Sequence, residues 1–149
     1  MRLLAILIPV FALVGGLYYW SRDPLADTPT DPHGFIALPL PDGADANTVL
    51  ILTPPHAAPD LEQRAAALQQ ALQQENIPAA RASRYLRNDP APGERARFDA
   101  LARQSGPIVI VRDKARANPP LADVIATYRA PEPPQPNRSQ RQSPRRRPH

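Results

Sequence analysis

His56 and Asp60 are the residues whose types and spacing could perform acid–base chemistry. They lie in a loop and at the start of a predicted helix, so the carboxylate could orient the imidazole as a general base. No motif places a Ser, Thr or Cys nucleophile beside them. An exposed loop histidine next to a helix-capping aspartate explains the pair better, so we predict no catalytic residue. Both stay candidates for binding, and an enzyme that uses His56 with Asp60 is the alternative.

The cysteine and histidine content excludes further kinds of site. The chain has no cysteine, which excludes disulfides, thiolate nucleophiles and CxxC redox chemistry. The three histidines, His33, His56 and His149, are scattered without ligand spacing, so we predict no metal site. The sequence holds no phosphate-binding loop and no hydrolase signature, and we predict no cofactor.

The C-terminal segment 131–149 carries the net charge of the chain. Its five arginines and one acidic residue, Glu132, give the same net charge of +4 as the whole sequence. It has no aromatic residue and is rich in Arg, Pro and Gln, a composition typical of disorder. Arg145, Arg146 and Arg147 could attract anionic lipid, an acidic partner or nucleic acid. Nucleic acid is disfavoured because stacking aromatic side chains are missing.

The N-terminal residues are typical of a membrane anchor. Residues 3–20 carry no charge, and a helix of that length spans about 27 Å, close to the thickness of a thin bilayer. Tyr18, Tyr19 and Trp20 end the stretch, where aromatic rings favour the headgroup region. We predict a single-pass anchor at 1–22 in the inner (cytoplasmic) membrane, a Pro-rich spacer at 23–46 and a domain outside the cytoplasm. A cleaved signal peptide is the alternative.

Between the spacer and the tail, the apolar pattern predicts a small α/β domain at 47–130. Two β-branched runs, Thr48–Thr53 and Ile108–Val111, are typical of strands buried on both faces. Helices are predicted to begin after Asp60, as N-cap, and at Pro119, after a capping Asn118. The remaining predicted elements are an extended segment, a helix and a short strand, at 77–85, 94–104 and 115–117. The order β-α-β-α-β-β-α predicts a sheet covered by helices on both faces.

Two parts of this pattern resemble the thioredoxin fold, in particular its glutaredoxin branch. One is the strand Thr48–Thr53 with the proline-bearing loop after it and the helix from Leu61. The other is the run from Gly106 to Lys114, which is similar to the strand–turn–strand segment that begins at the cis-proline of that fold. The resemblance therefore implies a cis peptide between Gly106 and Pro107 and makes Pro107 a candidate binding residue.

The residues that carry the family's chemistry do not match. Its CxxC pair would fall within 56–60, which holds no cysteine, and Ala117-Asn118-Pro119 stands where glutaredoxins have Gly-Gly. Redox activity and use of glutathione therefore do not carry over.

Abundant Arg, Ala and Pro indicate a GC-rich bacterial genome. The sequence predicts a non-catalytic module that binds a protein partner in or at the membrane of the bacterial envelope. Binding of anionic lipid or nucleic acid through the tail is a further alternative.

Overall fold

The computed structural model of the protein describes residues 25–26 and 28–131. The predicted anchor at 1–22 lies outside the described residues, as does the basic tail from 132 onward, with Arg145, Arg146 and Arg147. None of the helices in the described part is long and apolar enough to cross a membrane.

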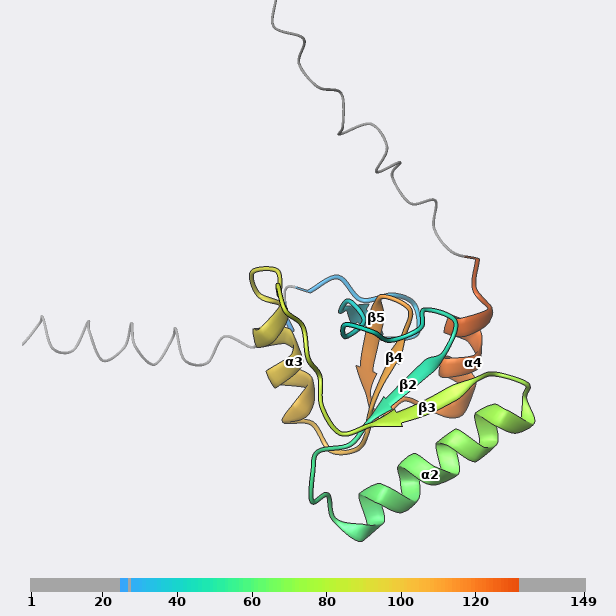
Figure 1. The fold of residues 1–149 in the computed structure, drawn as a ribbon. Coiled ribbons are helices and arrows are strands. Elements are labelled where there is room, and N and C mark those ends of the chain that lie inside the picture. Colours follow the sequence, from blue (N-terminus) through green and yellow to red (C-terminus); the bar gives the residue numbers. More distant parts are fainter. Residues whose placement is uncertain (1–24, 27, 132–149) are drawn as a thin grey trace, which may run out of the picture.

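The described chain forms one mixed sheet with three helices around it (Figure 1). The elements in chain order are β1 (Ile36–Ala37), β2 (Val49–Leu52), α2 (Pro59–Gln74), β3 (Ala79–Ala82), α3 (Glu94–Ala102), β4 (Ile108–Val111), β5 (Lys114–Ala117) and α4 (Leu121–Arg129). The strand order across the sheet is β1-β5-β4-β2-β3. Strands β2 and β3 run parallel, whereas the other neighbouring pairs are antiparallel. The prediction of a small α/β domain is confirmed.

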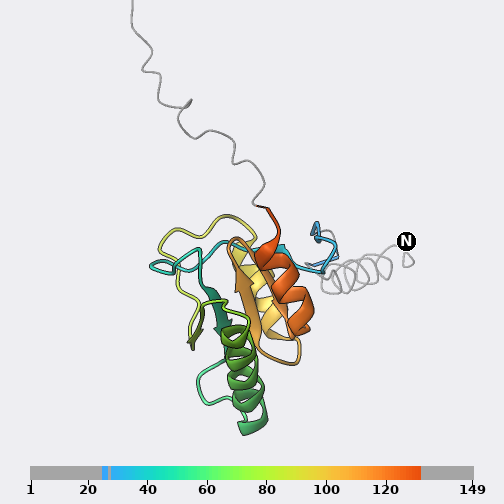
Figure 2. The same ribbon diagram turned by 90° about the vertical axis from the view of Figure 1, so that its right-hand side faces the viewer.

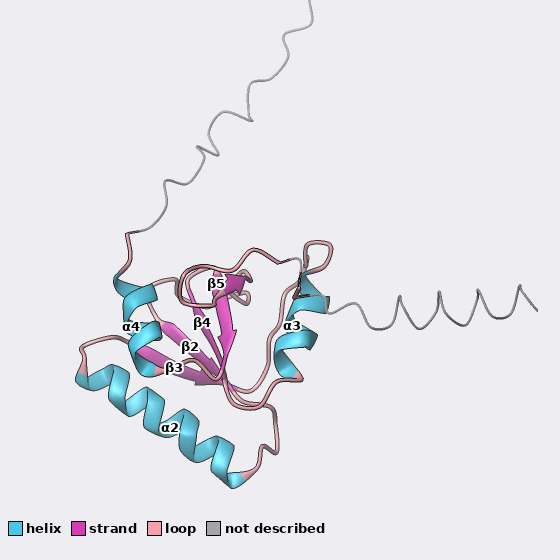
Figure 3. Ribbon diagram, turned by 180° about the vertical axis from the view of Figure 1, so that it is seen from behind, coloured by secondary structure: helices cyan, strands magenta, loops and turns pink. Residues whose placement is uncertain are grey.

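The two central strands supply core residues to both faces of the sheet, as their unbroken apolar sequences predict. In β2, Val49 and Ile51 pack with α2 and α4, while Leu50 and Leu52 point to the side of α3. Strand β4 alternates in the same way, and every residue of both strands is buried. Figure 2 shows α2 and α4 together on one side of the sheet, and Figure 3 shows α3 on the other.

Part of the predicted spacer belongs to the folded sheet. Ile36 and Ala37 form the edge strand β1, which pairs antiparallel with β5. Phe35 and Leu38 on either side are fully buried, one in each core. Strand β1 is only two residues long and lies at an edge of the sheet, where flanking prolines are tolerated.

Both predicted helix caps are wrong. Helix α2 begins at Pro59 with Ala58 as its N-cap, so Asp60 lies in the first turn and makes no capping hydrogen bond. Proline at the first helical position has its φ already fixed at a helical value, and it has no N–H that needs a cap. The helix therefore starts two residues earlier than predicted. Helix α4 begins at Leu121 with Pro120 as its N-cap. Asn118 instead takes a positive φ of 46° and donates its N–H to the carbonyl of Pro107.

The peptide between Gly106 and Pro107 is trans, so the implied cis bond is wrong. Gly106 has a φ of +110°, a backbone conformation that glycine adopts without steric cost. This conformation directs the chain into β4, where Asn118 pairs with Pro107 at the end of the hairpin. The turn that a cis-proline would supply is therefore supplied by the glycine before it.

Candidate functional site

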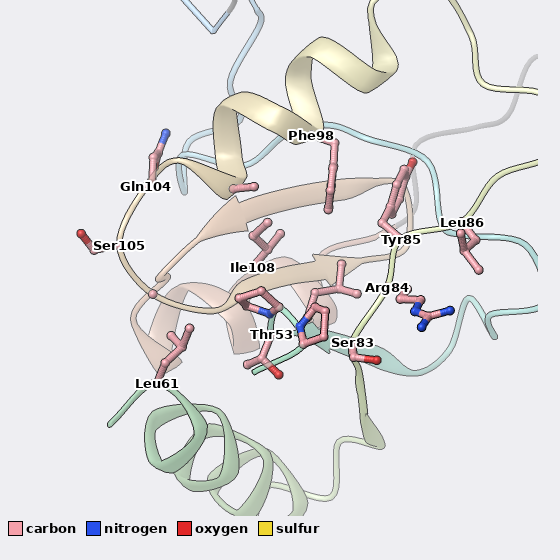
Figure 4. Close-up of a pocket in the computed structure, with 15 residues that line it drawn as sticks. Thr53, Leu61, Ser83, Arg84, Tyr85, Leu86, Phe98, Gln104, Ser105 and Ile108 are labelled. Carbon is pink, nitrogen blue, oxygen red and sulfur yellow. The ribbon is translucent and has the colours of Figure 1, made fainter. Parts of the chain in front are cut away.

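An apolar pocket of about 510 Å³ opens at the carboxyl end of β2, on the side of the sheet that faces α3 (Figure 4). It is lined by the end of β2 and its loop, the first turns of α2, the segment after β3, the helix α3 and the start of β4. The lining residues are Leu52, Thr53, Pro54, Pro55, Leu61, Ser83, Arg84, Tyr85, Leu86, Phe98, Ala102, Gln104, Ser105, Gly106 and Ile108.

The floor and one wall of the pocket are apolar. Leu52 and Ile108, which pair across β2 and β4, form the floor. Tyr85 and Phe98 stack with ring centroids 4.6 Å apart and an interplanar angle of 14°, and they form the wall below α3. Burial of a partner's apolar side chain here would contribute about 25 cal/mol for each Å² removed from water.

The pocket exists because the cover of this sheet face is incomplete. Helix α3 has nine residues, ends at Ala102 and packs mainly against β5. The chain then leaves α3 through Gln104, Ser105 and Gly106, which line the pocket opposite the loop Pro54-Pro55. The end of β2 is left between these segments, so the short helix leaves the opening.

The segment from Ser83 to Leu86 forms one end of the pocket and is open to solvent. Leu86 is 64% exposed, the only large hydrophobic side chain so exposed among the described residues. Ser83 and Arg84 are also exposed. Within the described chain, the backbone groups of Ser83, Arg84 and Tyr85 make no hydrogen bond, whereas the carbonyl of Leu86 accepts one from the N–H of Asp42. The pocket thus borders a stretch of backbone with free donors and acceptors.

A buried carboxylate holds this segment in place. The side chain of Glu94, the first residue of α3, has no exposed area. Its Oε1 accepts a hydrogen bond from the Tyr85 hydroxyl at 2.7 Å and lies 3.0 Å from the Nε of Arg87. Its Oε2 accepts the N–H of Ala91 at 3.0 Å. Burying a charge is costly unless it is paired and hydrogen-bonded, and the partners of Glu94 are Tyr85 in this segment and Arg87 and Ala91 just after it.

Residues 39–42, which precede β2, contact the same wall from outside. The Tyr85 hydroxyl lies 2.9 Å from the carbonyl of Pro39, and Arg87 donates to the carbonyl of Leu40 at 3.1 Å. The N–H of Asn88 donates to a carboxylate oxygen of Asp42 at 2.7 Å. Residues assigned to the spacer by sequence therefore position the pocket wall.

The hydroxyl of Tyr85 provides a test of this network by alkaline titration. Burial, followed by its hydrogen bond to the Glu94 carboxylate, raises the pKa of Tyr85 above the ordinary value of about 10. The unfolded chain releases this proton near pH 10 while the folded chain retains it, so stability is full below pH 10 and falls as the pH rises further. We expect the urea midpoint of Tyr85→Phe to decrease less steeply with pH above about pH 10 than that of the natural chain. An unchanged slope in that variant would contradict the role given to Tyr85.

The charge around the pocket is positive and uncompensated. Within the described chain, Arg84 lines the pocket and makes no ion pair or hydrogen bond, and no His, Asp or Glu is among the lining residues. Five other arginines of the described residues form ion pairs with carboxylates. The pairs are Arg64–Asp60, Arg81–Glu62, Arg87–Glu94, Arg116–Asp123 and Arg129–Glu75. The pocket therefore combines an apolar floor with an available cation.

The structure does not bring His56 and Asp60 together as an acid–base pair. His56 is exposed with a φ of 63°, and it does not line the pocket. Asp60 is exposed and pairs with Arg64 at 3.1 Å, one helical turn along α2. Pro107 is buried between Gly106 and Ile108, and it does not line the pocket. Each of these three residues is next in sequence to a residue that lines the pocket, but none of the three lines it.

Comparison with known proteins does not assign the pocket. No family model, curated protein or solved structure matches this chain. Among the residues the structure describes, no group of three or more His, Asp or Glu side chains is placed to hold a metal ion. The ligand of the pocket has to be inferred from the residues that line it.

Proposed function

We propose that this protein is a non-catalytic, membrane-tethered thioredoxin-like module of the bacterial envelope, and that it binds a protein partner through the pocket between β2 and α3. The observation that carries the proposal is the pocket itself. Its lining is mostly apolar, it is open to solvent, and the exposed Leu86 extends its apolar surface. An apolar opening bordered by an exposed hydrophobic side chain is typical of an interaction site.

The order of the elements supports the thioredoxin-like part of the proposal. From β2 onward the chain follows β-α-β-α-β-β-α, the order that the resemblance implies, with α2 and α4 on one face and α3 on the other. The trans peptide at Pro107 is a departure from that family. The apolar sequence 3–20 supports the tether, with the domain on the outer side of the inner membrane.

A pull-down from native membranes after chemical cross-linking tests the site of recognition. We expect Ala102→Trp to abolish recovery of the partner, because Ala102 is exposed, ends α3 and lines the pocket, so the larger ring fills it. The matched control is Ala122→Trp, an exposed alanine on α4 away from the pocket, which should recover the partner as the natural chain does. Equal recovery by both variants would contradict the proposal.

The same experiment separates the two alternatives. A chain shortened after Ala130 should recover the same partner if the domain is the recognition module, and loss of recovery would move the function to the tail. His56→Ala should also leave recovery unchanged, because His56 is exposed and outside the pocket. Loss of recovery in a folded His56→Ala chain would favour the enzyme that uses His56 with Asp60.

A further inference from the structure

We propose that the pocket recognises an extended segment of the partner that carries an apolar side chain next to a carboxylate. The segment pairs with the backbone of Ser83–Tyr85, inserts its apolar side chain over Leu52 and Ile108, and places its Asp or Glu on Arg84. This inference rests on the proposed function, because it specifies the chemistry of the partner that the pocket binds.

The free backbone of Ser83–Tyr85 provides the main-chain part of this recognition. These residues follow β3, whose last hydrogen bond to the β2 side joins the Thr53 N–H to the carbonyl of Ala82, so the segment beyond it no longer pairs with β2 and borders the pocket instead. Their N–H and C=O groups make no hydrogen bond within the described chain. An extended peptide that lies in the pocket beside Ser83–Tyr85 can satisfy such groups, with affinity from the backbone and specificity from side-chain pockets. The hydrogen bonds of the Tyr85 hydroxyl and the Leu86 carbonyl hold this stretch in place before a partner binds.

The shape of the pocket fits one or two apolar side chains of such a segment. The opening lies beside Ser83–Leu86, so a side chain pointing toward the sheet from a paired segment reaches the floor at Leu52 and Ile108. Figure 4 shows Arg84 and Leu86 at one end of the pocket and Gln104 and Ser105 at the other. Leu86 can cover the partner's side chain from outside, which removes further apolar surface from water.

The positive charge of Arg84 favours a negatively charged group on the partner segment. Its guanidinium is exposed at the pocket, and a carboxylate on the incoming segment can accept two parallel hydrogen bonds from it. Lysine or arginine at the same place would meet uncompensated positive charge instead. This argument also excludes the chain's own tail as the occupant, since that segment is rich in Arg and Pro and has no large apolar residue.

Selection from a random peptide library on the full chain in detergent micelles tests the inference. We expect the selected peptides to share a large apolar residue adjacent to Asp or Glu. Binding of such a peptide, measured by fluorescence polarisation, should weaken about tenfold or more in Arg84→Glu, the loss expected for a charge-assisted hydrogen bond. A peptide with Lys in place of the acidic residue should recover affinity for Arg84→Glu. The matched control is Arg95→Glu, an exposed arginine of α3 outside the pocket lining, and it should bind the acidic peptide as the natural chain does.

Three results would overturn the inference: selection of peptides without an acidic residue, selection of no peptide at all, or equal losses in Arg84→Glu and Arg95→Glu. The proposed function fails separately, when Ala102→Trp and Ala122→Trp recover the partner from membranes equally. If Ala102→Trp abolishes recovery of a partner whose binding is unchanged in Arg84→Glu, the proposed function stands. Only the requirement for an apolar side chain next to a carboxylate is then overturned.

Discussion

Replacing Glu94 with alanine is expected to destabilise the domain by about 3–5 kcal/mol, the cost of removing one partner from a buried ion pair. Glu94 is fully buried, and its removal leaves Arg87 without a counter-charge and both Ala91 N–H and the Tyr85 hydroxyl without this acceptor. Small domains are stable by only about 5–15 kcal/mol, so the loss is a large part of the total. The free energy of unfolding from urea titration measures it.

Two variants show whether the loss comes from the buried network. Glu94→Gln keeps an acceptor oxygen without the charge and should lose less stability than Glu94→Ala. Asp99→Asn changes an exposed acid on the same helix and should leave the free energy of unfolding within about 0.5 kcal/mol of the natural chain. If Asp99→Asn costs as much as Glu94→Ala, helix charge explains the effect and the network does not.

Gly106→Ala is expected to destabilise the protein by about 3 kcal/mol, from backbone strain together with steric overlap. The residue has a φ of +110°, which side-chain-bearing residues rarely adopt. A Cβ at this position would also lie 2.4 Å from the Cβ of Asn118. That atom is attached directly to the backbone of Asn118, so rotation of the side chain cannot relieve the overlap. The end of the β4–β5 hairpin would have to open.

The two parts of this cost can be measured separately. Gly43→Ala has a comparable φ of +81° and no atom within 4 Å of the added Cβ, so it should show the strain alone, about 1 kcal/mol. Asn118→Gly combined with Gly106→Ala removes the opposing Cβ and should recover most of the difference. Urea titration of the natural chain, Gly106→Ala, Asn118→Gly and the double variant gives the coupling energy. Equal losses in Gly43→Ala and Gly106→Ala would show that Asn118 makes no close contact.

The sequence predicted the parts of the fold whose stability comes from continuous apolar patterns. Strands β2 and β4 were found because four consecutive buried residues leave few other interpretations. Leu121, Val124 and Ile125 follow the same rule, since their helical spacing in the sequence matches the buried face of α4. Strand β3, with the sequence Ala-Ala-Arg-Ala, carries no β-branched or aromatic residue, and only its pairing with β2 makes it a strand.

The pocket could not be predicted because its residues meet only through tertiary contacts. Glu94 and Tyr85 are nine positions apart in an irregular loop and a helix, a separation with no fixed geometry. Pro39 reaches Tyr85 from a segment that proline content marks as a spacer. The one local signal was Leu86, a large apolar residue just before Arg87, and it is weak because single exposed leucines are common on protein surfaces.

Site-specific cross-linking at position 86 tests the central claim most directly. A photoreactive phenylalanine analogue replaces Leu86 in the full chain, and the control carries it in place of Gln73 on the exposed face of α2. After irradiation of native membranes, we expect a protein adduct from position 86, none from position 73, and loss of the adduct when Ala102→Trp fills the pocket. An adduct from position 73 alone, or one from position 86 that persists in Ala102→Trp, would show that the partner binds elsewhere.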